Sequence, residues 1–267
     1  LGSLFWACSL FWAWNGMEFI KKIRMSKFGL IGKSIDYSFS KKFFSEKFER
    51  ENLPHSYENF DIPSIELFRK IISTNPGLKG LNVTIPYKEI IIPFLDNLDE
   101  EAKKIGAVNT IKISEGKKLI GFNTDQYGFQ KSLEAFLPLR KKTALILGTG
   151  GASKSVAYVL KKLGFDFKFV SRTENTNTIK YESLDKAAIE DHLLIINCTP
   201  LGTYPNIHEY PTIPYDFLTE NHLLFDLIYN PAETEFLKQG KIRGAKTANG
   251  FRMLQLQAEK SWEIWNS

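Results

Sequence analysis

The chain has 267 residues, enough for two domains that each bury a core, and its 43% hydrophobic and 24% charged residues are ordinary for a globular protein. Its net charge of +5 is scattered without an Arg-rich block or a recognisable nucleic-acid module, which argues against nucleic acid as a partner. Cys8 and Cys198 are the only cysteines in the sequence, so a disulfide framework is excluded and a reducing cytoplasm is expected.

The first 24 residues differ in composition from the rest. Residues 1–15 are rich in Trp and Phe, and the basic residues follow them, which is the reverse of the order in a secretory signal. We therefore expect residues 1–24 to be extraneous sequence, with the folded part beginning near Met17 or Met25. A weak membrane-surface anchor is the alternative, but the aromatic residues have no clean polar face opposite them, so no stable membrane association is expected.

The first half of the chain alternates between strand-like and helix-like segments. Short apolar runs are followed by segments with apolar residues at helical spacing. Strands are expected at 27–31, 56–60, 80–83, 107–111 and 119–123, and helices at 41–51, 64–74, 99–105 and 126–136. This alternation predicts an α/β domain with a largely parallel sheet, whose last two strands form a pair joined by a turn.

Polar residues gather where two of these strands end. Thr84 to Lys88 follows the third strand and is expected to lead into a helix towards Ile92, and the fifth strand ends in Asn123-Thr124-Asp125. Open α/β sheets bind ligands at this edge. A helix dipole disfavours a cation in the first turn, so the charge of Lys88 is not explained as a cap. Taken singly, however, an exposed Lys88 and a helix-capping Asp125 are the ordinary interpretations.

Ser38 and Ser40 fall in a polar loop expected over residues 32–40. Their hydroxyls would share one side of an extended segment, because alternate residues of such a segment point the same way. The ordinary interpretation is that these serines cap the following helix.

Residues 143–164 predict a strand, a glycine turn and a helix in succession. The apolar run 143–147 is typical of a buried parallel strand, and it leads into Gly148-Thr149-Gly150-Gly151-Ala152. Glycines at such a turn let the backbone approach a pyrophosphate, whose charge then lies on the free N–H groups of the helix. An ordinary strand-to-helix turn is the alternative.

The next strand, expected over 165–170, ends in Ser171-Arg172-Thr173, where an NAD-binding fold places an acidic residue against the ribose. An arginine can bind a 2′-phosphate, so this segment favours NADP over NAD, although Glu174 follows directly. Further elements are expected as a short helix over 183–189, strands over 193–197 and 223–227, and a helix over 251–265. His55, His192, His208 and His222 lack metal-ligand spacing, so no metal is predicted.

Several motifs together resemble the shikimate dehydrogenase family. They occur in the family's order and are Asn82-Val-Thr-Ile-Pro-Tyr-Lys88, Gly106-Ala-Val-Asn-Thr110, Asn123-Thr-Asp-Gln-Tyr-Gly128 and the glycine turn at Gly148. The resemblance covers residues 27–265. It implies an α/β fold with two domains and a cleft between them. The substrate domain is expected over 25–124 plus 250–267, with the C-terminal helix returning to it, and a Rossmann-type NADP domain over 125–249.

The resemblance also implies an activity: NADPH-dependent, reversible reduction of 3-dehydroshikimate to shikimate, in aromatic amino-acid biosynthesis, by a monomer or homodimer. It makes Lys88 the proton donor in reduction and the base in oxidation, with Asp125 positioning it and binding a substrate hydroxyl. The family's substrate-binding positions fall on Ser38, Ser40, Thr84, Asn109, Tyr229 and Gln257. Tyr37 and Lys41 depart from the family's serine motif, in which His and Pro are frequent.

The cofactor positions implied by the resemblance are spread over four segments. They are Gly148, Thr149, Gly150, Gly151 and Ala152; Ser171, Arg172 and Thr173; Cys198, Thr199 and Pro200; and Gly250. Ordinary alternatives remain for some positions, since Cys198 suits a packing residue and Tyr229 a core aromatic. Gln255 lies on a different helix face from Gln257 and is not expected to reach the substrate.

Two other functions remain open. One is a quinate/shikimate dehydrogenase of the same fold that uses NAD. The other is a non-catalytic, ligand-sensing regulator with the same two-domain shell. The presence of both Lys88 and Asp125 argues against the regulator, as does the lack of an appended DNA-binding module.

Overall fold

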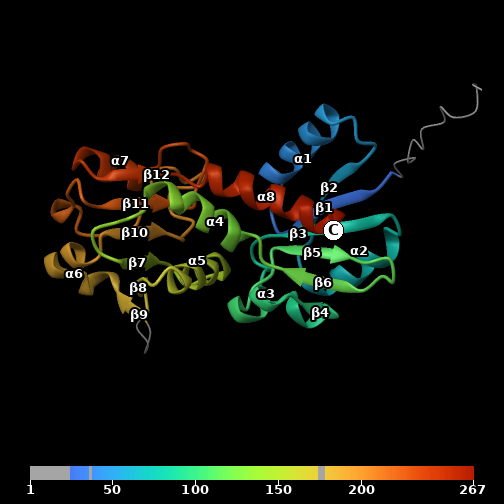
Figure 1. Cartoon of the computed structure of the whole chain (residues 1–267), viewed down its shortest axis with the longest axis horizontal. Coiled ribbons are helices and arrows are strands. Elements are labelled where there is room, and N and C mark those ends of the chain that lie inside the picture. Colours follow the sequence, from blue (N-terminus) through green and yellow to red (C-terminus); the bar gives the residue numbers. More distant parts are fainter. Residues whose placement is uncertain (1–24, 36–37, 174–177) are drawn as a thin grey trace, which may run out of the picture.

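The computed structural model describes residues 25–35, 38–173 and 178–267, and within them the chain forms two six-stranded sheets (Figure 1). The segment expected to be extraneous, residues 1–24, lies outside the described residues, as do Tyr37 and Glu174. The two sheets lie at opposite ends of the long axis of the molecule, and helices cover their faces. The predicted α/β architecture is confirmed.

The first sheet has the strand order β2-β1-β3-β5-β6-β4. All neighbouring strands are parallel except β5, which runs antiparallel to both β3 and β6, so the predicted strand pair is confirmed. The strands are β1 (Lys27–Gly32), β2 (Ser56–Asp61), β3 (Leu78–Val83), β4 (Asn97–Leu98), β5 (Thr110–Ile113) and β6 (Leu119–Phe122).

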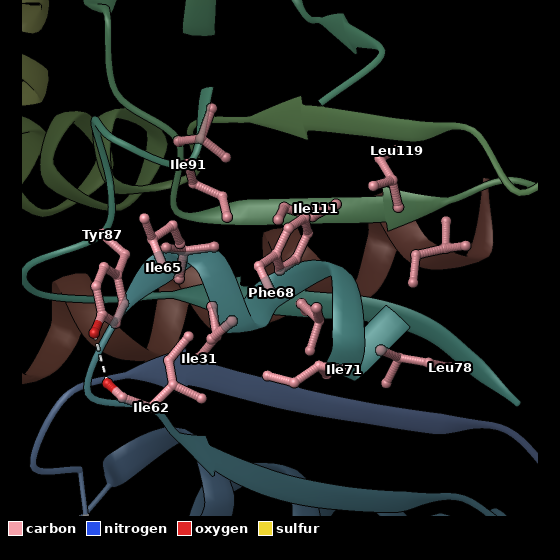
Figure 2. Packing of buried hydrophobic residues seen from close by; sticks show 14 of the residues in the cluster. Ile31, Ile62, Ile65, Phe68, Ile71, Leu78, Tyr87, Ile91, Ile111 and Leu119 are labelled. Carbon is pink, nitrogen blue, oxygen red and sulfur yellow. Dashed lines mark hydrogen bonds between the residues drawn. The ribbon is translucent and has the colours of Figure 1, made fainter. Parts of the chain in front are cut away.

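Helices pack on both faces of this sheet. They are α1 (Phe39–Arg50), α2 (Phe68–Thr74) and α3 (Glu100–Ile105), with the short 3-10 helices η1 (Ile65–Leu67) and η2 (Ile92–Phe94). The next two elements, α4 (Asp125–Leu133) and the 3-10 helix η3 (Glu134–Phe136), pack instead on the second sheet, because Phe129, Leu133 and Phe136 lie in its core. Figure 2 shows the core beneath α2, where Phe68 and Ile111 are fully buried. Tyr87 closes one end of this core by donating a hydrogen bond to the carbonyl of Ile62 at 2.5 Å.

Two local predictions at the edge of this sheet are wrong. The helix expected to run from Lys88 towards Ile92 is a turn followed by η2, because Pro86 and Pro93 each lack an N–H and restrict the residue before them. The extended segment expected at Ser38 to Ser40 ends at Ser38, since α1 already begins at Phe39.

The second sheet is parallel throughout, with the order β12-β11-β10-β7-β8-β9. Its strands are β7 (Thr143–Leu147), β8 (Asp166–Ser171), β9 (Thr178–Lys180), β10 (Leu194–Asn197), β11 (Leu223–Asp226) and β12 (Lys246–Ala248). The other elements of this half are α5 (Gly151–Lys162), α6 (Lys186–Asp191), α7 (Glu235–Ile242), η4 (Tyr181–Ser183) and η5 (Tyr215–Phe217). The strands β7, β10 and β11 are fully or almost fully buried, which explains their continuous apolar runs.

The last helix, α8 (Phe251–Asn266), joins the two halves (Figure 1, red). It starts beside the second sheet and ends on the first, where Trp265 covers Gly80 and donates its indole N–H to the carbonyl of Ile111 at 3.0 Å. The predicted return of this helix is therefore seen directly. The limits predicted for the two domains, 25–124 plus 250–267 and 125–249, stay a prediction. No helix of the described residues is long and apolar enough to cross a membrane.

Candidate active site

A cavity of about 530 Å³ opens at the carboxyl edge of the first sheet and reaches the second half of the chain. Every substrate-binding residue predicted from the sequence lines it: Ser38, Ser40, Thr84, Lys88, Asn109, Asp125, Tyr229 and Gln257. These residues lie at the start of α1, in the segments that follow β3 and β11, in the segment before β5, and in α4 and α8. The fold thus brings together side chains that are widely separated in the sequence.

Lys88 and Asp125 form an ion pair in this cavity. The ammonium nitrogen of Lys88 lies 2.6 Å from Oδ2 of Asp125, and the side chains are 16% and 7% exposed. The other carboxylate oxygen, Oδ1, accepts a hydrogen bond from the amide of Asn109 at 2.9 Å. Asp125 is therefore held from two sides, and it can in turn fix the position of the ammonium group.

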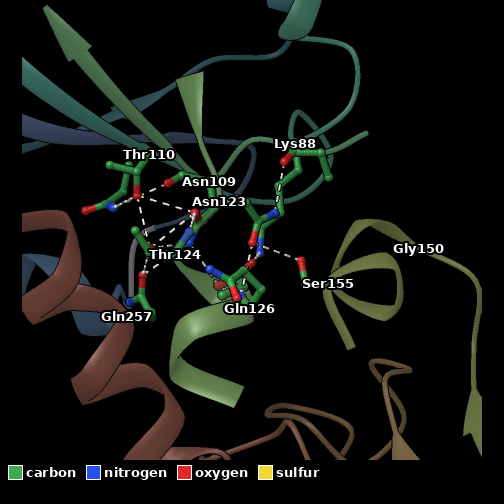
Figure 3. Close-up of polar contacts among 12 residues, drawn as sticks. Lys88, Asn109, Thr110, Asn123, Thr124, Gln126, Gly150, Ser155 and Gln257 are labelled. Carbon is green, nitrogen blue, oxygen red and sulfur yellow. Dashed lines mark hydrogen bonds and ion pairs between the residues drawn. The ribbon is translucent and has the colours of Figure 1, made fainter. Parts of the chain in front are cut away.

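Asn109 is itself held by its neighbours. Its Oδ1 accepts a hydrogen bond from the backbone N–H of Thr124 at 2.6 Å. Its amide also donates to Oε1 of Gln257 at 3.3 Å, so α8 contributes to the same network. Figure 3 shows these polar groups converging near Lys88, with Gly150 and Ser155 on the facing turn and helix.

Ser38 combines the two roles that the sequence left open. Its hydroxyl accepts a hydrogen bond from the backbone N–H of Lys41 at 3.3 Å and so caps α1, while the residue also lines the cavity. Ser40 lies within α1 and is buried. Tyr229 packs edge-on against Phe39 with ring centroids 5.6 Å apart, and burial raises the pKa of its phenol.

The glycine turn lies against the site. Gly148 has φ +101°, a conformation that L side chains rarely adopt, and a Cβ there would lie 3.1 Å from the methyl group of Thr199. A Cβ on Gly151 would lie 3.3 Å from Cβ of Lys88. The turn after β7 is therefore in contact with Lys88, which follows the third strand of the first sheet.

Two polar contacts join α5 to this edge of the first sheet. Ser155 donates a hydrogen bond to Oδ1 of Asn123 at 3.1 Å, and both residues are buried. Lys154 forms an ion pair with Glu89 at 2.5 Å. The segment that carries Lys88 is thus tied to the helix that follows the glycine turn.

Comparison with known proteins identifies the family. Residues 30–111 match the model of the shikimate dehydrogenase substrate binding domain. A shikimate dehydrogenase (NADP+) from Methanosphaera stadtmanae is 38% identical over 257 aligned positions, which cover 89% of this chain and 90% of the relative. The chain belongs to the shikimate dehydrogenase family. The resemblance predicted from the motifs is confirmed.

Solved structures of shikimate dehydrogenases share the fold. Shikimate dehydrogenase 1 from Peptoclostridium difficile is 40% identical with a TM-score of 0.80, covering 91% of this chain and 92% of that one. Shikimate 5-dehydrogenase from Thermus thermophilus, in complex with NADP(H) and shikimate, is 31% identical with a TM-score of 0.80, covering 90% and 93%.

The residues predicted to hold the family's cofactor follow one edge of the second sheet. The backbone N–H of Gly148 donates to the carbonyl of Val170, which places Ser171 and Arg172, at the end of β8, beside the glycine turn. Arg172 is exposed, and no heavy atom would lie within 4 Å of a Cβ on Gly150, so an anionic group can approach both. These residues fit a dinucleotide that carries a 2′-phosphate.

The structure gives two other predicted cofactor residues a packing role. Burial raises the pKa of the Cys198 thiol, as does the nearby Asp226, so a packing residue suits this position better than a nucleophile. Gly250 packs onto the backbone, since a Cβ there would lie 2.0 Å from the carbonyl oxygen of Leu227. Gly250 therefore fixes the loop that leads to Tyr229.

Sequence reasoning did not assign several polar residues that line the cavity. The chief one is Asn82, which is 4% exposed and whose amide donates to the hydroxyl of Ser261 at 2.9 Å. The sequence does carry a signal for Asn82, since it lies in the apolar run of a strand. A buried amide needs hydrogen-bond partners, so its presence there indicates a polar network. Thr203, Tyr204, Pro205 and Asn230 also line the cavity, from loops without a distinctive pattern.

Proposed function

We propose that this chain catalyses the NADPH-dependent, reversible reduction of 3-dehydroshikimate to shikimate, within aromatic amino-acid biosynthesis in the cytoplasm. The observation that supports this most strongly is the Lys88–Asp125 pair, with 2.6 Å between its charged atoms, in a cavity lined by hydroxyl and amide groups. Membership of the shikimate dehydrogenase family supports both the substrate and the preference for NADP.

Lys88 handles the proton in this proposal. When bound, the cofactor supplies a hydride to the carbonyl carbon, and the oxygen of that carbonyl must gain a proton as its C=O bond becomes a C–O–H group. The Lys88 ammonium donates this proton in reduction, and the neutral amine accepts it in oxidation. Asp125 holds the ammonium in place and accepts a hydrogen bond from a substrate hydroxyl.

The remaining lining residues orient a hydroxylated cyclic acid. Ser38 and Ser40 donate hydroxyl hydrogen bonds to its carboxylate, with Tyr229 nearby. Thr84, Asn109 and Gln257 bind ring hydroxyls. An analogue that lacks a ring hydroxyl would leave one of these buried polar side chains without a hydrogen-bond partner. We therefore expect the site to discriminate strongly against such analogues.

The cofactor is held by the edge of the second sheet in this proposal. The turn from Gly148 to Ala152 binds the pyrophosphate at the start of α5, and Arg172 binds the 2′-phosphate. The contact between Gly151 and Lys88 supports the placing of both reactants at one site.

A spectrophotometric assay of the purified chain tests the proposal. We expect NADP+ to be reduced when shikimate is added, with lower kcat/KM for NAD+ and for quinate in place of shikimate. Faster turnover with quinate and NAD+ would instead assign the alternative dehydrogenase. Tight binding of shikimate without turnover with either cofactor would assign a ligand-sensing regulator.

A further inference from the structure

A buried carboxylate outside the substrate cavity connects the two halves of the site. Asp226 is the last residue of β11 and is fully buried. Its Oδ1 accepts hydrogen bonds from the amide of Asn197 at 3.1 Å and from the backbone N–H of Ile228 at 3.0 Å. Its Oδ2 accepts one from the hydroxyl of Thr234 at 2.6 Å. An ionised carboxylate can only accept hydrogen bonds, and both oxygens of Asp226 have donors here.

On one side the network reaches the glycine turn. Asn197, the last residue of β10, is the register partner of Asp226. Its Oδ1 accepts hydrogen bonds from the backbone N–H of Thr199 at 3.0 Å and from the hydroxyl of Thr199 at 2.6 Å. Thr199 in turn lies against Gly148. The carboxylate therefore fixes the loop after β10, which continues into the cavity-lining Thr203.

On the other side the network reaches the substrate cavity. Ile228, whose N–H is bound by Asp226, directly precedes Tyr229, and its carbonyl accepts a hydrogen bond from the N–H of Gly250 at 3.0 Å. The loops after β10 and β11 also meet each other, because the N–H of Tyr204 donates to the carbonyl of Asn230 at 3.4 Å. Both loops are thus anchored on one side chain.

We propose that Asp226 is a positioning residue that holds the loops over residues 198–205 and 227–231 in one arrangement, on which binding of both NADP(H) and shikimate depends. The proposal rests on the proposed function for the identity of these ligands. Asp226 does not line the substrate cavity, so it acts through Asn197 and Ile228. Burial raises the pKa of the Asp226 carboxyl group to about 6, so this group is mostly ionised at neutral pH. The titratable groups near it are Cys198 and Tyr215, and its negative charge raises the pKa of both.

Three variants and a control test this role. Asp226→Ala removes both acceptors, whereas Asp226→Asn keeps Oδ1 and offers an amide donor that the Thr234 hydroxyl can accept. Thr234→Val removes one donor and leaves Asn197 untouched. Ile189→Ala is the control, because Ile189 is fully buried in the same core cluster as β11 but lies in α6. The measurements are the Kd for NADPH by fluorescence titration, the KM for shikimate, kcat and the Tm.

We expect Asp226→Ala to raise the Kd for NADPH and the KM for shikimate together, each by about tenfold or more, since hydrogen bonds to a buried charge are lost. Asp226→Asn should restore both constants to within about threefold of the parent chain, because it keeps most of the hydrogen bonds. Ile189→Ala should lower the Tm and change neither constant.

Unchanged ligand constants in Asp226→Ala, or an equal rise in Ile189→Ala, would overturn the proposal in favour of a purely structural role. If Asp226→Ala does not fold, Thr234→Val decides, with a rise in both constants supporting the proposal and no change refuting it. Failure of the proposed function is a separate result, because the NADPH titration needs no turnover.

Discussion

Lys88 and Asp125 are 37 positions apart in the sequence, yet their charged atoms lie 2.6 Å apart. Taken singly, Lys88 could be an exposed surface lysine and Asp125 a helix cap, but their ion pair contradicts both interpretations. Asp125 does not cap α4, since it is the first residue of that helix and its carboxylate is bound by Lys88 and Asn109. Lys88 is not a solvated surface lysine, because most of its side chain is buried.

Replacing Lys88 by Ala should reduce kcat by roughly 10²–10⁴-fold, the usual effect of removing a general acid and base. NADPH should still bind, because the glycine turn is unchanged. The measurement is steady-state kinetics together with a fluorescence titration of NADPH. Near-normal turnover would remove Lys88 from the mechanism. Lys131→Ala is a suitable control, since that lysine lies on the same helix as Asp125 but pairs with Glu134 outside the cavity.

Replacing Arg172 by Ala should weaken NADPH binding much more than NADH binding, because only NADPH carries the 2′-phosphate. Loss of one charge-assisted contact corresponds to about tenfold or more in Kd. Titration of both cofactors against the variant and the parent chain measures the difference. Equal losses for the two cofactors would contradict the assignment.

At the scale of secondary structure, α8 shows how helical spacing separates a site residue from its neighbour. Gln257 faces the substrate cavity and is 5% exposed, whereas Gln255 lines a different, outer groove beside Phe251. The sequence predicted this difference, because two positions along a helix point in different directions.

These two glutamines form a matched pair for mutation. Gln257→Ala should raise the KM for shikimate by roughly tenfold, the effect of one lost hydrogen bond in a buried site. Gln255→Ala should leave the KM unchanged. Both constants come from the same assay at saturating NADP+. If both changes altered the KM for shikimate equally, the prediction that Gln257 alone binds the substrate would be wrong.

Strands with continuous apolar runs were predictable, and the shortest strands were not. The strands β7, β10 and β11 are buried, and each is visible in the sequence as a continuous run of apolar residues. By contrast β9 and β12 have three residues each, too few for a periodic pattern. The predicted helix after Lys88 is wrong because Pro86 and Pro93 limit the segment.

For the whole molecule, Asp226 makes stability depend on pH. Its pKa is raised from 3.8 to about 6 by burial, so between these values the folded chain holds a proton that the unfolded chain has released. Raising the pH through this window therefore lowers the free energy of unfolding, by about 3 kcal/mol for this group.

Comparing the parent chain with Asp226→Asn isolates this effect, because the other titratable groups are common to both. The variant should gain stability relative to the parent as the pH rises from about 4 to about 7. Urea unfolding at several pH values measures the difference. A difference that does not vary with pH would show that the folded-state pKa of Asp226 is close to its unfolded value.

The sequence by itself determined the fold class and the family and predicted which residues line the cavity, because these depend on local patterns: apolar runs, a glycine turn and short motifs in a fixed order. Only the tertiary structure decided which side chains meet. The ion pair of Lys88 with Asp125, the packing of Gly151 against Lys88 and the anchoring of two loops on Asp226 all join residues far apart in the chain. No local pattern encodes such distances, since they arise only when α8 returns to the first sheet and α5 forms contacts with the segments that follow its strands.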